Sequence, residues 1–167
     1  MPSTTAGERP QPEGAADELP FDLSVGYQLR MANRAMQRYL QARIEPHGVT
    51  LGMWYFLRAL WQEDGLTQRE LSQRIGTMEP TTLTALAAME RSGLVTRERD
   101  PQDRRKLSVR LTAHGQALRS RLLPYAREVV EQATHGMSVA ERAQFLRSLA
   151  LVQSNLADAG GPEPAGD

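Results

Sequence analysis

The chain has 167 residues, of which 40% are hydrophobic and 24% charged, and its 20 Lys and Arg balance 20 Asp and Glu to a formal net charge of zero. This composition is typical of a globular protein, and no apolar run approaches the ~20 residues that a membrane span needs. The chain has no cysteine, which excludes disulfides, a thiolate nucleophile and a cysteine-based zinc site. The N-terminus lacks a basic start followed by an apolar core, so we expect a cytoplasmic protein without a membrane partner.

The zero net charge hides an uneven distribution along the chain. Residues 1–22 sum to −4 and residues 157–167 to −3, which leaves +7 on residues 23–156. Both ends are rich in Pro, Gly, Ala and acidic residues, and such segments bury too little surface to offset the entropy of ordering. We therefore expect disordered acidic tails at 1–21 and 157–167. Because the folded body between them is basic, the net charge does not exclude nucleic acid as a partner.

The body opens with two predicted helices. Residues 23–45 place apolar side chains at helical spacing, and Pro46-His47-Gly48 ends this helix. Thr50 can cap a second helix that runs to about Glu63. Its apolar positions are Met53, Trp54, Phe56, Leu57, Leu60 and Trp61. The aromatic cluster of Trp54, Tyr55, Phe56 and Trp61 is expected to lie mostly in the core.

Two short helices joined by a tight turn come next. Thr67 and Glu70 form a capping box that opens the first helix, and Gly76 ends it. Pro80 suits the first turn of the second helix, where its missing N–H does no harm. The residues assigned to the apolar face of the second helix are Leu83, Leu86 and Met89. This arrangement is the pattern of a helix-turn-helix.

A hairpin and two long helices complete the body. Alternating residues in 94–99 and 107–112 predict two strands, which would form a wing directly after the helix-turn-helix. Leu107, Val109 and Leu111 fall on one face of the second strand. Thr112 caps a helix to about Ala133, in which Pro124 predicts a kink. Ser138 and Glu141 form a second capping box, and the last helix is expected to turn Phe145, Leu149, Val152 and Leu156 inward. The predicted fold class is therefore mainly α with a small β-hairpin wing.

The hairpin carries the sharpest charge signal. Residues 97–110 hold six basic and three acidic side chains, with Asp103, Arg104, Arg105 and Lys106 at the tip. A basic tip beside a helix-turn-helix favours insertion of an arginine into a DNA minor groove, where narrow stretches concentrate negative potential. The alternative is a solvated charged hairpin.

The two short helices supply the other candidate DNA contacts. Arg69, Gln73 and Arg74 on the first helix are candidate phosphate contacts. On the second helix, small polar and methyl-bearing side chains would suit a major groove, and the candidates are Glu79, Thr81, Thr82, Thr84 and Ala85. This helix has little Arg, Asn or Gln for paired hydrogen bonds to bases, so we expect modest direct readout.

The first predicted helix offers a candidate ligand site. Arg30 and Arg34 lie one turn apart and could hold a carboxylate beside the aromatic cluster, although they could equally be surface arginines. The chain shows few of the patterns that indicate catalysis. The histidines His47, His114 and His135 have no metal-ligand spacing, and the chain has neither a nucleophile elbow nor a Gly-rich phosphate loop. We therefore expect neither an enzyme nor a cofactor.

Five segments together resemble the MarR family of bacterial winged-helix regulators. They are Leu71–Ile75, Pro80–Leu83, Met89–Val95, Asp100–Lys106 and Val109–Gly115, and the resemblance covers roughly residues 23–156. It implies a homodimer built by helices in 22–48 and 113–156, and a DNA-binding lobe at 50–112 with its wing at 94–112. It also implies a supporting helix at 67–75 and a recognition helix at 79–91. The wing would place Arg104 or Arg105 in the minor groove, while Asp103 pairs with Arg91 or Arg97.

The resemblance further implies a small effector, often phenolic or a carboxylate, bound between the dimer helices and the DNA-binding lobe. The residues that map there are Tyr27, Arg30, Met31, Arg34, His47, Met53, Trp54 and Leu57. We therefore expect a homodimeric repressor that binds pseudo-palindromic double-stranded DNA and is released by an effector such as an aromatic carboxylate or its thioester. The alternative is a winged-helix module that binds protein instead of DNA.

Overall fold

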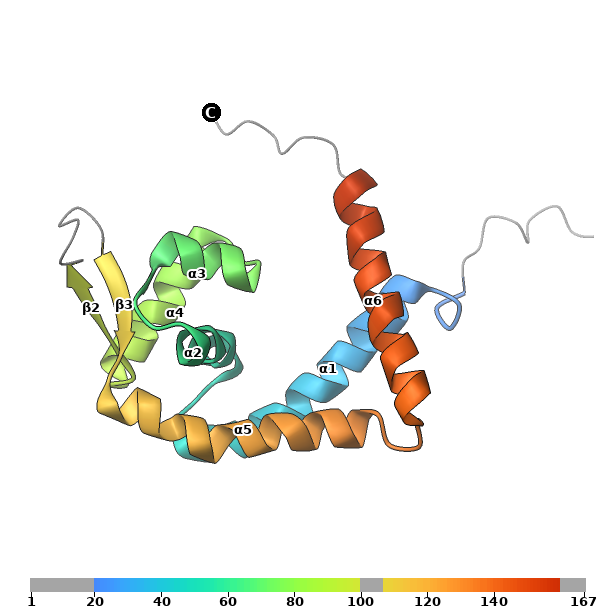
Figure 1. The fold of residues 1–167 in the computed structure, drawn as a ribbon, viewed down its shortest axis with the longest axis horizontal. Coiled ribbons are helices and arrows are strands. Elements are labelled where there is room, and N and C mark those ends of the chain that lie inside the picture. The colour runs from blue at the N-terminus through green and yellow to red at the C-terminus, as the bar shows by residue number, and fades with distance from the viewer. Residues whose placement is uncertain (1–19, 100–106, 160–167) are drawn as a thin grey trace, which may run out of the picture. The chain divides into compact units, whose positions relative to one another are not determined.

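The computed structural model describes residues 20–99 and 107–159. Its elements in chain order are α1 (Val25–Ile44), η1 (Glu45–His47), α2 (Leu51–Gln62), β1 (Leu66–Thr67), α3 (Gln68–Ile75), α4 (Glu79–Arg91), β2 (Val95–Arg99), β3 (Leu107–Leu111), α5 (Ala113–Ala133) and α6 (Val139–Ala159). The predicted mainly helical fold with a hairpin is confirmed (Figure 1). Two compact units divide the chain between Arg38 and Tyr39, within α1. None of the helices in the described ranges is both long and apolar enough to cross a membrane.

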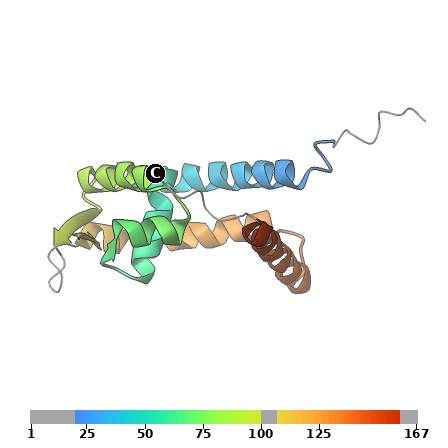
Figure 2. The same cartoon turned by 90° about the horizontal axis from the view of Figure 1, so that it is seen from above.

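The small sheet joins the hairpin to the segment before α3. Its antiparallel order is β1-β3-β2, with Leu66 opposite Val109 and Val95 opposite Leu111. Gly65 has a φ of 80°, and its N–H donates to the Val109 carbonyl at 3.1 Å. The strand β1 was not predicted, because two residues show no alternation. From the sheet, α5 leads away toward α6 (Figure 2).

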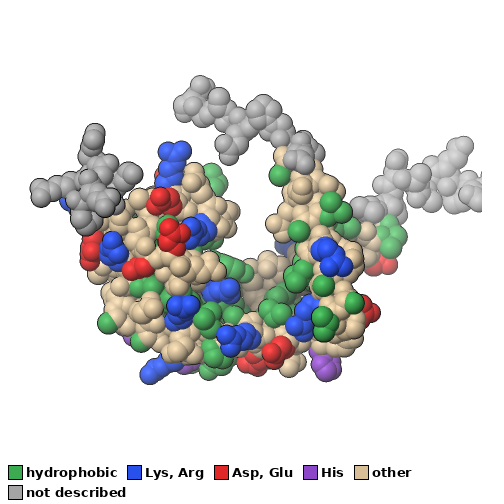
Figure 3. Space-filling model, in the orientation of Figure 1, with side chains coloured by type: hydrophobic (Ala, Val, Ile, Leu, Met, Phe, Trp, Pro, Cys, Tyr) green, Lys and Arg blue, Asp and Glu red, His purple; other side chains and the backbone are tan. Residues whose placement is uncertain are grey.

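Helix α6 has an apolar face, and none of its residues with a described side chain is buried in the single chain. Its capping box is confirmed: the Ser138 N–H donates to Glu141 at 2.7 Å, and the Glu141 N–H donates to the Ser138 hydroxyl at 3.2 Å. Hydrophobic side chains gather along it in Figure 3. The prediction that its apolar face turns inward is wrong for Phe145 and Leu156, which are 43% and 68% exposed in the single chain, whereas Leu149 and Val152 are half-buried. No described segment of the second unit buries this face.

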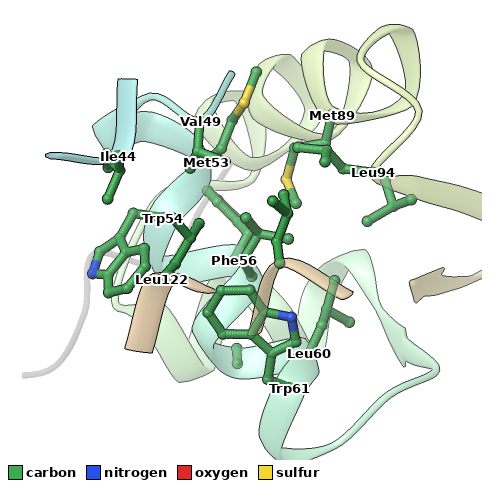
Figure 4. Packing of buried hydrophobic residues seen from close by; sticks show 14 of the residues in the cluster. Ile44, Val49, Met53, Trp54, Phe56, Leu60, Trp61, Met89, Leu94 and Leu122 are labelled. Atoms are coloured by element: carbon green, nitrogen blue, oxygen red, sulfur yellow. The ribbon is translucent and has the colours of Figure 1, made fainter. Parts of the chain in front are cut away.

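The core is built around α2, which contacts α3, α4, α5 and β3. Contact on several sides explains why this helix is apolar over most of its circumference. Trp54 and Trp61 pack edge to face with ring centroids 5.9 Å apart (Figure 4). Leu122 from α5 and Met89 from α4 are both 0% exposed and belong to the same core. Thr50 makes no side-chain cap on α2; instead, the Leu51 N–H donates to the Gln41 side chain at 3.0 Å.

Two hydrogen bonds at Gly115 fix the start of α5 against the core. The Trp61 Nε1–H donates to the Gly115 carbonyl at 2.9 Å, and the Gly115 N–H donates to the Thr112 hydroxyl at 3.0 Å, which confirms the predicted cap. A Cβ placed on Gly115 would lie 2.1 Å from the Leu94 carbonyl oxygen. The first turn of α5 therefore lies so close to the backbone of Leu94, just before β2, that only glycine fits at position 115.

A polar cluster ties the end of α1 to α5. The Tyr39 hydroxyl and the Arg43 guanidinium both donate to Glu128 Oε1, at 2.8 Å and at 2.6–2.9 Å, and the guanidinium lies 3.4 Å from the centroid of the Tyr39 ring. These hydrogen bonds lower the pKa of Glu128, and the bond from Arg43 contributes more than the bond from Tyr39. The same carboxylate raises the pKa of Tyr39 and of Arg43.

Glu128→Gln is expected to lower the Tm at neutral pH and to have less effect in acid. A carboxylate whose pKa is lowered on folding adds stability above its unfolded pKa, about 4.3, and loses that contribution as pH falls through the folded value. The difference in Tm between wild type and variant should therefore shrink between about pH 5 and pH 3. Thermal melts at several pH values measure it, with Glu131→Gln on the same helix as the control. A difference that stays constant over this range would contradict the assignment.

Candidate nucleic-acid interface

Helices α3 and α4 form the predicted helix-turn-helix beside the hairpin (Figure 1). The capping box of α3 is confirmed: the Thr67 N–H donates to the Glu70 carboxylate at 2.7 Å, and the Glu70 N–H donates to the Thr67 hydroxyl at 3.3 Å. Gly76 ends α3 with a φ of 70°, a left-handed conformation that suits glycine. Leu71 is fully buried and anchors the helix. Gly76, Thr77 and Met78 form the turn between α3 and α4.

A buried pair of hydroxyls fixes the packing of α3 against α4. Ser72 Oγ and Thr82 Oγ1 lie 2.7 Å apart, and Thr82 Oγ1 is also 3.3 Å from the Met78 carbonyl. Thr82 is 0% exposed, so its prediction as a DNA contact is wrong. The inward assignment of Leu83 is wrong too, because this side chain is 46% exposed. The other two predicted inner residues, Leu86 and Met89, are both 0% exposed and confirm the rest of that face. Thr82, whose hydroxyl is hydrogen-bonded to Ser72, takes the place expected for Leu83.

The outer face of α4 therefore differs from the predicted one. The predicted contacts Glu79, Thr81 and Thr84 are exposed, whereas Ala85 is half-buried and packs against the core. Sequence reasoning missed three further exposed residues on the outer side, Pro80, Leu83 and Arg91, and the half-buried Ala87 between them. Their spacing of three and four residues is the signal that could have found them, once Thr82 is placed inside.

Helix α3 presents its predicted contacts to solvent. Arg69, Gln73 and Arg74 are all exposed. Arg74 forms an ion pair with Glu63 at 2.5 Å, which holds its guanidinium against the end of α2. A shallow groove of about 460 Å³ brings predicted contacts of α3 and α4 together, and it is lined by Thr67, Gln68, Arg69, Glu70, Gln73, Glu79 and Leu107.

The root of the wing is rich in ion pairs. Arg97 on β2 donates to Glu90 of α4 at 2.8 Å, and Arg110 on β3 lies 3.5 Å from Glu98. Of the two arginines proposed to pair with Asp103, Arg97 thus already has a partner on α4. The pair with Glu90 joins the base of the hairpin to the last turn of α4. The predicted tip residues Asp103, Arg104, Arg105 and Lys106 lie outside the described residues.

The predicted effector residues fall into two groups. Tyr27, Arg30, Met31 and Arg34 are exposed on one side of α1, in the first compact unit. His47 is half-buried, with its ring 5.7 Å from that of Tyr125. Met53, Trp54 and Leu57 are 8%, 2% and 0% exposed, so their assignment to a ligand cleft is corrected: they belong to the core around α2.

Comparisons with known proteins agree with this geometry. The model of the MarR family matches residues 49–107, which include α3, α4 and the wing up to the start of β3. HTH-type transcriptional regulator TtmR of Methylorubrum extorquens (strain PA1) is 31% identical over 153 residues, or 90% of this chain and 76% of the relative. The homoprotocatechuate degradative operon repressor of Escherichia coli is 31% identical over 126 residues, or 75% and 84%. The crystal structure of the S. aureus MepR–DNA complex aligns with a TM-score of 0.73 at 26% identity, covering 81% of this chain and 98% of that one.

Proposed function

Because the chain belongs to the MarR family of transcriptional regulators, we propose that it is a homodimeric repressor that binds operator DNA and is released by a small organic anion. The observation that carries the DNA-binding part is the exposed outer face of α4, set beside the groove that α3 and β3 form with it. The structural similarity to MepR, which was solved bound to DNA, supports the same use of this surface. Recognition helices of such dimers enter successive major grooves about one helical turn apart.

The exposed apolar face of α6 supports the homodimer. Phe145, Leu149, Val152 and Leu156 share one side of the helix by their spacing. In the single chain Phe145 is 43% and Leu156 68% exposed, and Leu149 and Val152 are half-buried. A contiguous apolar surface of this kind marks a protein–protein interface. A second copy would cover it, and its two-fold axis would match a pseudo-palindromic operator.

Arg105→Ala is expected to weaken duplex binding about tenfold and to reduce the dependence on salt. Each protomer would lose one cation at the wing tip, so the slope of log K against log salt should fall by about two for the dimer. Fluorescence anisotropy at several salt concentrations, on a duplex selected from a random pool, measures both. Arg121→Ala, an exposed arginine on α5, is the control. An unchanged affinity and slope would remove Arg105 from the interface, and the same titration on Arg104→Ala tests the other tip residue.

A basic groove offers a site for the effector within the second unit. It has a volume of about 430 Å³ and is lined by Arg58, Leu123, Ala126, Arg127, Val130, Glu131 and Arg142. Among the described residues, none of its three arginines forms an ion pair, and Arg58 lies 5.7 Å from the centroid of the Trp54 ring. Unpaired guanidiniums above an apolar floor suit an aromatic carboxylate.

Homoprotocatechuate is the probe for this site, because a relative represses the operon that degrades it. The acid should raise the Tm of the wild type by a few degrees at saturation, since a ligand bound only by the folded state stabilises it. Arg127→Ala should abolish the rise and Arg121→Ala should keep it, as thermal shift would show. If both variants respond like the wild type, the acid binds elsewhere.

A further inference from the structure

The middle of the outer face of α4 is apolar. Leu83 is 46% exposed, and Pro80 and Ala87 lie within one turn of it. The Thr84 hydroxyl donates to the Pro80 carbonyl at 3.1 Å, so its proton is already used within the helix. Met78, just before the helix, is 76% exposed. An apolar surface therefore stands where a recognition helix meets the base edges.

Hydrogen-bonded reading of bases needs side chains that this part of the helix lacks. Paired bonds to guanine come from Arg or Lys, and paired bonds to adenine from Asn or Gln. Helix α4 is described in full from Glu79 to Arg91, and its one residue of these kinds is Arg91 in the last turn. The apolar group that a base pair presents in the major groove is the C5 methyl of thymine.

We propose that Leu83 contacts a thymine methyl in each half-site and thereby sets where the operator requires thymine. This inference rests on the proposed DNA-binding function. Packing the leucine against the methyl removes apolar surface of both from water, which an unmethylated pyrimidine would not reproduce. The contact is specific to thymine, because the other three bases offer no methyl group at that edge.

Replacing thymine by deoxyuridine tests the contact, since this removes the methyl and keeps the hydrogen-bonding groups. Duplexes enriched from a random pool by the full-length wild type would carry the exchange at one symmetry-related pair of thymines at a time, with Kd measured by anisotropy. At one pair, the wild type should bind about fifteenfold more weakly, because one methyl-sized group accounts for about fourfold at each of the two half-sites. Leu83→Ala should bind both duplexes equally, and alanine keeps the helix because its helix propensity is the highest.

Two further variants sharpen the result. Leu83→Met retains an apolar side chain of similar length and should keep the discrimination between thymine and deoxyuridine. Tyr55→Ala removes a 49%-exposed side chain from α2, outside the groove, and should keep it as well. The assignment of Leu83 is overturned if the wild type binds every deoxyuridine duplex with the same Kd as the thymine duplex. It is also overturned if Leu83→Ala still binds the thymine duplex more tightly than the deoxyuridine duplex. If the pool yields no enriched duplex, it is the proposed function that fails, and this outcome is distinct from the other two.

Discussion

Gly115→Ala is expected to lower the free energy of unfolding by about 3 kcal/mol, because the added methyl has no room. The new Cβ would lie 2.1 Å from the Leu94 carbonyl oxygen, and this oxygen is backbone that no rotamer change can move. Relief requires α5 to withdraw from the start of β2, which stretches the bond from Trp61 to the Gly115 carbonyl. The Tm should fall by about 6–12 °C for a chain of this size.

Gly52→Ala is the matched control for this substitution. Gly52 also lies in the first turn of a helix, and a Cβ there would meet only the Thr50 side chain, at an ordinary 3.7 Å. Because alanine favours helix over glycine by up to about 1 kcal/mol, this variant should melt at or slightly above the wild-type temperature. Circular dichroism melts of both variants provide the comparison. Equal Tm values for the two would show that α5 shifts at no cost and that the close approach is unimportant.

Trp54→Ala is expected to cost about 3–5 kcal/mol of stability, the range for removing a buried large aromatic side chain. Trp54 is 2% exposed and packs edge to face on Trp61, so the truncation leaves a cavity in the middle of the core. Denaturant titration followed by circular dichroism measures the loss. The result also separates two roles, because a tryptophan that served mainly as a ligand contact would change effector affinity and leave the stability of the free protein nearly intact.

The neighbouring residue provides the control for Trp54. Tyr55 is on the same helix but is 49% exposed, so Tyr55→Ala should change stability by at most about 0.5 kcal/mol. If both variants lose the same stability, the packing around α2 differs from the one described.

The features that depend on neighbours in sequence were predictable. Both capping boxes, at Thr67 and Ser138, follow from residues three apart, and the structure confirms them. The positions of α3 and α4 follow from the same local chemistry. The strand β1 was missed because its partner β3 lies about forty residues away and two residues carry no periodic signal.

The features that depend on distant partners were predicted less well. The inner face of α4 was predicted correctly at Leu86 and Met89 and wrongly at Leu83. Thr82 is buried instead, with its hydroxyl bonded to Ser72 on another helix. An apolar residue is assigned to the core by default, and this default misplaced Leu83. The same default turned α6 inward, although its apolar face is not buried in the single chain. Trp54 and Leu57 were assigned to a ligand cleft from the family resemblance. Apolar residues suit both cores and ligand sites, and burial in the structure distinguishes the two.

The bond between Trp61 and Gly115 determines where the chain can be cut to exchange the DNA-binding lobe with that of a relative. The wing ends at Leu111, yet Leu118 and Leu122 of α5 are 3% and 0% exposed and belong to the same core as α2. A fragment cut after the wing would leave the Trp61 Nε1–H without its acceptor and one side of that core open to water. A chimera that transplants operator specificity should therefore cross over within α5 beyond Leu122, where the graft carries its own closing helix.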